Sequence, residues 1–251
     1  KADGSCTYFC VDLAYHWDKL KRNPSYLVSI LGADHHGYVQ RIRAGVSALS
    51  DDSFDIEDQF KIVIGQLVNL VRDGAPIKMS KRSGQMITLK EVIDEIGSDA
   101  IRFFMVYCSA NTHMDFDLEL AKRQSSENPV YYIQYAHARL CRILRKFEVK
   151  GLAVPDLLSL DEIFDDTERA MALLSLKSYD VIWDASVSLM PHKLTTYAYE
   201  LARSFHLFYE RCPIMKAEPS VQKKRLFLIY QVRFVLATCL GLLGVKAPES
   251  M

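Results

Sequence analysis

The stretch Tyr26-Leu-Val-Ser-Ile-Leu-Gly-Ala-Asp-His-His-Gly37 indicates the fold of the first part of the chain. It begins with an apolar run of strand length that ends at Gly32. Apolar residues at helical spacing follow over 38–49, and Phe60–Leu67 is a second apolar run. A strand, a helix and another strand in this order predict a parallel sheet with a right-handed crossover. Because such sheets bind ligands at the carboxyl ends of their strands, we expect a ligand site just after Gly32.

Shorter elements flank this predicted sheet. Upstream, Thr7–Val11 has the composition of a short strand, and Asp12 is placed to cap a helix over Leu13–Lys21. An acidic loop is expected between the helix and the second strand of the sheet. Downstream, the spacing of apolar residues predicts short helices over 91–96, 99–107 and 116–123.

Beyond Asn128-Pro129 the pattern predicts long helices and no strand. Leu226–Leu243 is apolar on nearly every side, so we expect it to be the central helix of a bundle. The predicted fold class is therefore α/β plus all-α. We predict an α/β part over residues 1–90, a helical connector over 91–127 and a helical bundle over 128–251.

A lysine-containing segment, Gly74-Ala-Pro-Ile-Lys-Met-Ser-Lys-Arg-Ser-Gly84, follows the second predicted strand. Lys78 and Lys81 can converge on a polyphosphate while Ser80 and backbone N–H groups donate hydrogen bonds to it. The spacing differs from that of a P-loop, because no glycine directly precedes the lysine–hydroxyl pair. Two lysines on a surface loop are otherwise ordinary solvated charge. The segment is thus a candidate nucleotide-binding loop.

The composition is that of an ordinary globular protein, with 31 basic and 31 acidic side chains among 251 residues. This balance gives no support to a nucleic-acid binder, although a local basic stripe remains compatible with it. The longest uncharged apolar run, Phe234–Val245, is shorter than the roughly 20 residues that a membrane span needs, so we expect no membrane partner. The six cysteines lack metal-ligand spacing and are expected to be free thiols of a cytoplasmic protein.

Lys78-Met79-Ser80-Lys81 resembles the KMSK signature of class I aminoacyl-tRNA synthetases, and its surroundings resemble arginyl-tRNA synthetases in particular. Further stretches resemble that family in family order, namely Gly32–Gly37, Asn128–Arg139 and Leu242–Met251. The family's HIGH signature, His-x-Gly-His, does not occur in the sequence, and the sequence does not begin with methionine. The resemblance implies the C-terminal portion of an arginyl-tRNA synthetase without its N-terminal part. The expected fold is the second half of a Rossmann-like catalytic domain followed by a helical anticodon-binding bundle.

The resemblance also implies an activity, arginine–tRNA ligation. Members of this family form arginyl-adenylate from arginine and ATP, with Mg²⁺, and then transfer arginine to its tRNA. By this resemblance Lys78, Ser80 and Lys81 correspond to the catalytic segment. Positive charge that strengthens its contact with the departing pyrophosphate lowers the activation barrier of adenylate formation. As a fragment of such an enzyme, the chain is expected to be inactive alone.

The resemblance assigns the arginine pocket to the α/β part. The family places a tyrosine and an aspartate at the spacing of Tyr8 and Asp12 against the substrate arginine, and Asp34 is the next candidate for the same pocket. A guanidinium or an α-amino group favours a carboxylate partner with directional hydrogen bonds. Judged from the residues alone, Asp12 is more often a helix cap.

ATP is assigned to the turn after the first strand and to the lysine segment. Gly32 lets the backbone approach the ribose and a histidine packs near it, for which we choose His36. The two histidines in sequence also allow a metal site, but neighbouring side chains on a strand point to different sides, so no metal is expected. The predicted ATP-binding residues are Gly32, His36, Lys78, Met79 and Lys81.

Arginine tRNA is the expected macromolecular partner of the helical bundle. In the family, tyrosines in Tyr-x-x-Tyr register face the anticodon, and Tyr132 and Tyr135 match them. Arg139 lies on a basic face with Arg142, Arg145 and Lys146, and such a face can neutralise phosphates. Tyrosines on a helix are otherwise more often core residues. The family's last methionine lies near the anticodon loop, which assigns Met251 to the same surface, whereas His206 stands where the family usually has asparagine.

Three alternative functions differ in what they require. The chain can be a tRNA-binding module that catalyses nothing, because it lacks the HIGH half. It can belong to another class I synthetase, such as the cysteine enzyme, although the scattered cysteines and Tyr132–Arg139 disfavour this. The third alternative is an unrelated nucleotidyltransferase. It is disfavoured because such an enzyme has no function for the predicted bundle over 128–251. In each case the sheet is expected to be incomplete and to have an exposed edge.

Overall fold

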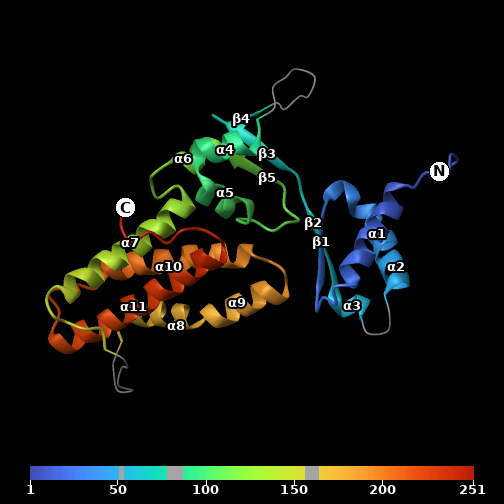
Figure 1. Cartoon of the computed structure of the whole chain (residues 1–251). Helices are drawn as coiled ribbons and strands as arrows, with labels where there is room; N and C mark the ends of the chain where they lie inside the picture. The colour runs from blue at the N-terminus through green and yellow to red at the C-terminus, as the bar shows by residue number, and fades with distance from the viewer. Residues whose placement is uncertain (51–53, 78–86, 156–163) are drawn as a thin grey trace. The chain divides into compact units, whose positions relative to one another are not determined.

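The computed structural model describes residues 1–50, 54–77, 87–155 and 164–251, and the chain divides into two compact units (Figure 1). The first unit, the α/β unit, contains Lys1–Val68 and Ala110–Met114. The second unit contains Asn69–Ser109 and Asp115–Met251. An α/β part followed by helices agrees with the predicted fold class. The finer boundaries at residues 90 and 127 stay predictions.

The α/β unit is built on the parallel pair that the sequence predicts. β1 (Leu27–Gly32) pairs in parallel with β2 (Phe60–Gly65), with Leu27 opposite Phe60 and Gly32 opposite Gly65. The connection between them contains a 3-10 helix, η1 (Ala33–Tyr38), then α2 (Val39–Leu49) and α3 (Ile56–Gln59). Asp55 caps α3 by accepting hydrogen bonds from the backbone N–H groups of Glu57 and Asp58, so the expected acidic loop is partly helical.

The predicted strand at Thr7–Val11 is wrong, because α1 extends over Tyr8–Leu20 and Thr7 is its N-cap residue. Asp12 therefore lies inside the helix and does not cap it. Phe9, Leu13 and Leu20 recur at helical spacing and pack against the buried cluster of Leu27, Ile42, Val46 and Phe60. This packing outweighs the β-propensity of the first residues.

α1 and α2 approach each other closely at Gly45. A Cβ atom at this position would overlap the side chain of Leu13 and lie 3.2 Å from Cζ of Phe9. Only glycine therefore allows these two helices to pack at this distance, and the contact holds α1 against the sheet core.

A second sheet, which the sequence analysis missed, precedes the helical region. β3 (Val68–Arg72) lies between β4 (Ala75–Pro76) and β5 (Met114–Asp117). β3 and β4 form a tight hairpin across Asp73 and Gly74, whose φ values of 51° and 75° suit the left-handed turn that an Asp-Gly pair favours. The predicted helix from Phe116 is wrong in its first part, because Phe116 is in β5 and α6 (Leu118–Lys122) begins after Asp117.

Within the described ranges, the remaining elements of the second unit are helices, as predicted. α4 (Leu89–Ile96) begins with a capping box between Thr88 and Glu91, and α5 (Ser98–Met105) follows it. The described residues after Asn128 contain helices and no strand. These helices, which we call the bundle, are α7 (Pro129–Glu148), α8 (Asp166–Leu176), α9 (Ser178–Val187), α10 (His192–Arg211) and α11 (Pro219–Leu242).

The bundle core joins α7, α10 and α11, which contact one another pairwise (Figure 1). Phe147, Leu201, Phe205 and Ile229 are almost completely buried in it. Within the described residues, α11 is the one helix long and apolar enough to cross a membrane by length and composition. The central helix of a bundle meets the same criterion, and α11 contributes a row of buried residues to this core, so the criterion is weak evidence here.

Candidate functional site

Tyr8 and Asp12, the predicted arginine-binding pair, lie one turn apart on α1. The Tyr8 side chain is 90% exposed. Asp12 is half-buried and its Oδ2 accepts a hydrogen bond of 2.7 Å from the hydroxyl of Tyr38, at the end of η1. Burial and this carboxylate raise the pKa of Tyr38 to about 12, so the phenol stays neutral and keeps donating. Asp12 is thus held in one orientation by a residue that the sequence analysis did not select.

Gly32, Asp34 and His36 occupy the carboxyl end of β1, where the sequence predicts a ligand site. A Cβ atom at Gly32 would lie 2.7 Å from Oδ1 of Asp34, so glycine permits the turn into η1. Nε2 of His35 is 3.6 Å from Oδ2 of Asp34, and His36 is exposed. The turn therefore presents one carboxylate and two imidazoles to solvent, which suits the recognition of a polar ligand.

Lys78, Met79, Ser80 and Lys81 lie outside the described residues. The chain on both sides of this segment is anchored. Upstream, the N–H of Ile77 donates a 2.8 Å hydrogen bond to the carbonyl of Leu70, which extends the β3–β4 hairpin. Downstream, Thr88 caps α4. The Asp73-Gly74 pair, which lies beside the segment, is the signal that could have revealed this hairpin.

The predicted tRNA residues Tyr132, Tyr135 and Arg139 come together around a hollow of about 490 Å³ between α7 and α10. Its walls also include Tyr131, which precedes these tyrosines on α7, and three side chains that the sequence did not assign to RNA or left in doubt. These three are Ser126, His206 and Glu210, and we call the whole set the aromatic hollow.

The rings of the aromatic hollow are arranged as a stack. Tyr131 and Tyr135 are nearly parallel, with centroids 6.2 Å apart and an interplanar angle of 13°. His206 continues the stack, 6.0 Å from Tyr135 at 21°, and its ring is 4.7 Å from that of Tyr132. The guanidinium carbon of Arg139 lies 4.1 Å from the centre of the Tyr209 ring, within the range of a cation–π contact. Aromatic faces beside a fixed cation suit an unpaired base and its phosphate.

His206 is the least expected member of this group. Its Nε2 is buried and has no hydrogen-bond partner among the described residues, and burial together with nearby Arg139 lowers the pKa of its imidazole. A neutral ring is therefore favoured beside the cation. The one-turn spacing of His206 and Glu210 on an amphipathic helix is the sequence signal that could have placed both in the hollow.

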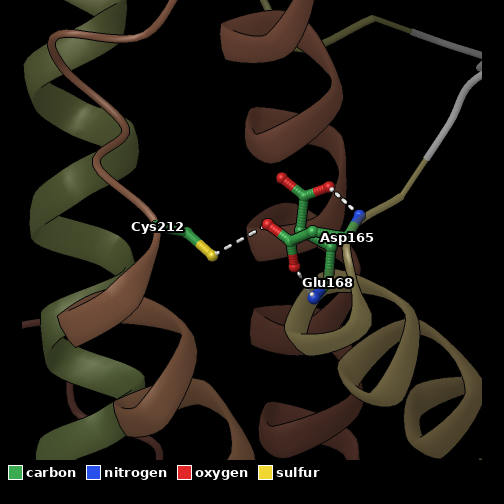
Figure 2. A group of neighbouring side chains, drawn as sticks. All are labelled: Asp165, Glu168 and Cys212. Atoms are coloured by element: carbon green, nitrogen blue, oxygen red, sulfur yellow. Dashed lines mark hydrogen bonds between the residues drawn. The ribbon is translucent and has the colours of Figure 1, made fainter.

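Asp165, Glu168 and Cys212 form the group in the described residues whose ligand atoms lie close enough to hold a metal ion (Figure 2). Their contacts indicate a structural role. Glu168 is 1% exposed and binds Nζ of Lys224 at 2.7 Å and Nε of Arg225 at 2.6 Å.

The remaining contacts of this group also indicate a structural role. Asp165 caps α8 by accepting a hydrogen bond from the N–H of Glu168, and Oδ2 of Asp165 lies 3.5 Å from the thiol of Cys212. Burial and Asp165 raise the pKa of that thiol to about 11, so it stays protonated. Cations and a neutral thiol thus already satisfy the carboxylates, and the group joins α8 to α11.

Comparison with known protein families gives one match on the α/β part of the chain and another on the bundle. Residues 21–117 match the model of class I tRNA synthetases (I, L, M and V), and residues 133–251 match the DALR anticodon binding domain. The arginine–tRNA ligases of Syntrophotalea carbinolica and Moorella thermoacetica are 44% and 42% identical to this chain over its whole length. The chain spans 45% and 44% of those relatives.

Structural comparison gives the same relationship. A crystal structure described as an arginyl-tRNA synthetase from Campylobacter jejuni matches all of this chain and 54% of its own, with a TM-score of 0.86 and 33% identity. Along this chain the class I synthetase match precedes the anticodon-binding match, as the α/β part precedes the bundle. From the unbroken sequence similarity and the shared fold, we conclude that this chain belongs to the arginyl-tRNA synthetase family and corresponds to the C-terminal part of its members.

Proposed function

We propose that this chain is the tRNA-binding part of a cytoplasmic enzyme that joins arginine to its tRNA. The observation that carries the proposal is the aromatic hollow. Four of its lining residues, Tyr135, Arg139, His206 and Glu210, lie on the segment that matches an anticodon-binding model. Most of its walls are rings, a guanidinium and a carboxylate. An unpaired nucleotide uses all three kinds of group, since its base stacks on rings, its polar edge binds a carboxylate and its phosphate binds a guanidinium.

An unpaired base of the anticodon loop enters the hollow in this proposal. It stacks on Tyr135, while the carboxylate of Glu210 accepts hydrogen bonds from its exocyclic amino or ring N–H groups. Arg139 contacts the adjoining phosphate. Because the RNA backbone is bound largely through charge, the affinity is expected to fall with salt, and the stacking contribution to fall less.

Binding of an arginine tRNA transcript by the chain tests this proposal. Tyr135→Ala removes a stacking face and is expected to weaken binding about 10-fold, since one base–aromatic stack contributes about 1–3 kcal/mol. Tyr179→Ala, at a 73% exposed tyrosine on α9, is the matched control and is expected to leave affinity unchanged. Equal effects of the two substitutions would show that the hollow is not the binding surface.

For the chemical step we propose the reaction of the family. The carboxylate of arginine attacks the α-phosphate of ATP and expels pyrophosphate, and the tRNA ribose then takes the arginyl group and releases AMP. Lys78 and Lys81 follow the negative charge onto the pyrophosphate, with Ser80 and Met79 in the same segment and Mg²⁺ arriving with the nucleotide. Gly32 and His36 hold the rest of ATP.

The arginine pocket is proposed to consist of Tyr8, Asp12 and Asp34. The hydrogen bond from the Tyr38 hydroxyl supports this proposal, because it orients the Asp12 carboxylate toward η1, the element that contains Asp34. Asp12→Ala and Asp34→Ala, made in the longer protein, are expected to raise the KM for arginine. An unchanged KM for arginine in both aspartate variants contradicts the pocket.

Lys81→Ala is expected to lower the activation rate by about 30-fold or more while ATP affinity changes little, since one such donor supplies about 2–4 kcal/mol.

The chain by itself is proposed to bind tRNA without forming the adenylate. The supporting observation is that it spans less than half the length of its matched relatives. ATP–pyrophosphate exchange measured with arginine, tRNA and this chain is expected to stay at background. Exchange above background would show that the residues of this chain suffice.

A further inference from the structure

The last residues of the chain fold back along α7 rather than leaving the bundle (Figure 1). The reversal occurs at Gly244, which has a φ of 66° and where a Cβ atom would lie 2.9 Å from Nη1 of Arg102. Val245, directly after it, is 4% exposed. The reversal thus needs glycine and is anchored by one buried apolar side chain. We call residues 246–251 the tail.

Three side chains of α7 hold the tail. Nε2 of Gln134 donates to the carbonyl of Lys246 at 2.9 Å and to Oδ2 of Asp99 at 3.0 Å. Nδ1 of His137 is 2.8 Å from the carbonyl oxygen of Pro248, and since a carbonyl can only accept, this nitrogen carries the proton. Arg145 donates to the carbonyl of Glu249 at 3.0 Å. We call Gln134, His137 and Arg145 the clasp.

The clasp is a specific arrangement. At about 100° per residue, its three positions fall within roughly 80° of one another around α7. Every member binds a backbone carbonyl of the tail, and Arg145 also pairs with the Glu249 carboxylate at 3.3 Å. The clasp therefore fixes the path of the chain mainly through its backbone. His137 is 2% exposed and burial lowers its pKa, so a polar group has been buried to make this contact.

The clasp and the aromatic hollow occupy neighbouring faces of the same helix. Tyr135 and Arg139 lie about 100° and 140° around α7 from Gln134, by the same helical geometry. The Met251 side chain, at the end of the tail, is 55% exposed although it is apolar. The tail thus lies on the face of α7 next to the one that lines the hollow.

We propose that Gln134, His137 and Arg145 are positioning residues that hold the tail, and with it Met251, against RNA bound in the aromatic hollow. This inference rests on the proposed tRNA binding. The clasp residues contact the tail and need not contact the RNA. Their substitution therefore affects RNA affinity only while the tail is present.

The first test measures the tail itself, without RNA. Carboxypeptidase release of residues from the whole chain, followed by intact mass, is expected to be several-fold faster in Gln134→Ala than in the wild type. Gln134 is only half-buried, so this substitution leaves the bundle folded, whereas His137 is buried and is kept for a second variant. Gln40→Ala, at an exposed glutamine of α2, is the matched control. Unchanged release in Gln134→Ala overturns the clasp.

The second test is a double-mutant cycle with arginine tRNA as the probe. In the intact chain, Gln134→Ala is expected to weaken binding about 3- to 10-fold, as loss of one or two hydrogen bonds allows. In a chain that lacks residues 246–251, the same substitution is expected to change binding less than 2-fold, within the error of ~0.4 kcal/mol typical of such cycles. An equal loss in both backgrounds contradicts positioning through the tail.

Together, the carboxypeptidase test and the double-mutant cycle distinguish failure of the clasp from failure of tRNA binding. If the wild-type chain fails to bind arginine tRNA, tRNA binding is wrong and the role of the tail in it falls as well, whereas carboxypeptidase release still decides whether the clasp holds the tail. If the chain binds tRNA and deletion of the tail changes nothing, tRNA binding stands and the inference is wrong.

Discussion

The bundle and the α/β unit bury their apolar residues to very different extents. In the bundle, α7, α10 and α11 each contribute completely buried side chains, such as Leu140, Leu201 and Ile229. In the α/β unit, one face of the sheet packs on α1 and α2, whereas Val28 and Ile30 of β1 are 42% and 76% exposed. Parallel strands are normally covered on both faces.

The difference in core packing bears on which function the chain can perform alone. The aromatic hollow lies on the unit that has a complete core. The proposed arginine residues and two of the proposed ATP residues lie on the unit whose sheet has an uncovered apolar face. We therefore expect RNA binding to be separable from catalysis, and the α/β unit to unfold more readily than the bundle.

The largest expected effect concerns the buried ion group of the bundle. Glu168→Gln removes the carboxylate between Lys224 and Arg225, and breaking a buried pair from one side typically costs about 3–5 kcal/mol. The chain has two tryptophans, Trp17 on α1 and Trp183 on α9, so Trp17→Phe leaves a fluorescence reporter of the bundle alone. Urea unfolding of that protein with and without Glu168→Gln measures the loss.

The matched control is Glu127→Gln, because Glu127 pairs with Arg123 at the surface. Exposed pairs typically contribute at most about 1 kcal/mol, so the urea midpoint is expected to change little. Similar losses in both variants would mean that the ion group at α8 is not buried as the structure shows, and the contrast between the two units would weaken.

A smaller effect on the free energy of unfolding is expected from one glycine-to-alanine substitution in each unit. Gly45→Ala inserts a methyl group against Leu13 and Phe9 and is expected to destabilise the α/β unit by about 1–3 kcal/mol. Gly241→Ala, on α11, places the same group in open space and is expected to stabilise the bundle by up to about 1 kcal/mol. Urea unfolding followed through Trp17 or Trp183 measures each; a stabilising Gly45→Ala would refute the close α1–α2 contact.

The smallest expected effect is a pH dependence of bundle stability. Burial lowers the pKa of His137 and of His206 below their usual 6.5, so the unfolded chain takes up protons first as the pH falls. The free energy of unfolding should therefore decline as the pH drops below about 6.5, until both folded histidines are protonated. His206→Gln should flatten the decline between pH 6.5 and 5, as followed through Trp183. A decline that is unchanged in this variant would remove His206 from the explanation.

The main elements could be predicted from the sequence because their signals are local. The apolar runs of β1 and β2 and the crossover between them specify a parallel pair, and Asn128-Pro129 marks the start of α7, where Asn128 caps the helix. Tyr132, Tyr135 and Arg139 share a helix, so their proximity follows from spacing. That they face a hollow does not, because the opposite wall, His206 and Glu210, belongs to α10.

The parts that could not be predicted depend on contacts between distant segments. Thr7–Val11 has β-type residues, and only packing against the α2 and sheet core makes them helical. β5 forms because β3 offers it an edge, with Asn69 donating to Asp115 at 3.0 Å. The clasp likewise joins α7 to the tail through backbone carbonyls, which leave no signature in the side-chain pattern.

Recognition of the anticodon loop by the aromatic hollow is tested most directly by comparing two RNAs on this chain. We would measure binding of arginine tRNA and of the same tRNA with a substituted anticodon loop, at two salt concentrations, for the wild type and Tyr135→Ala. We expect the wild type to prefer the native loop at both salt concentrations and Tyr135→Ala to lose most of this preference. Equal, salt-sensitive binding of both RNAs by the wild type would contradict it, because the aromatic hollow would then contribute no recognition of the loop.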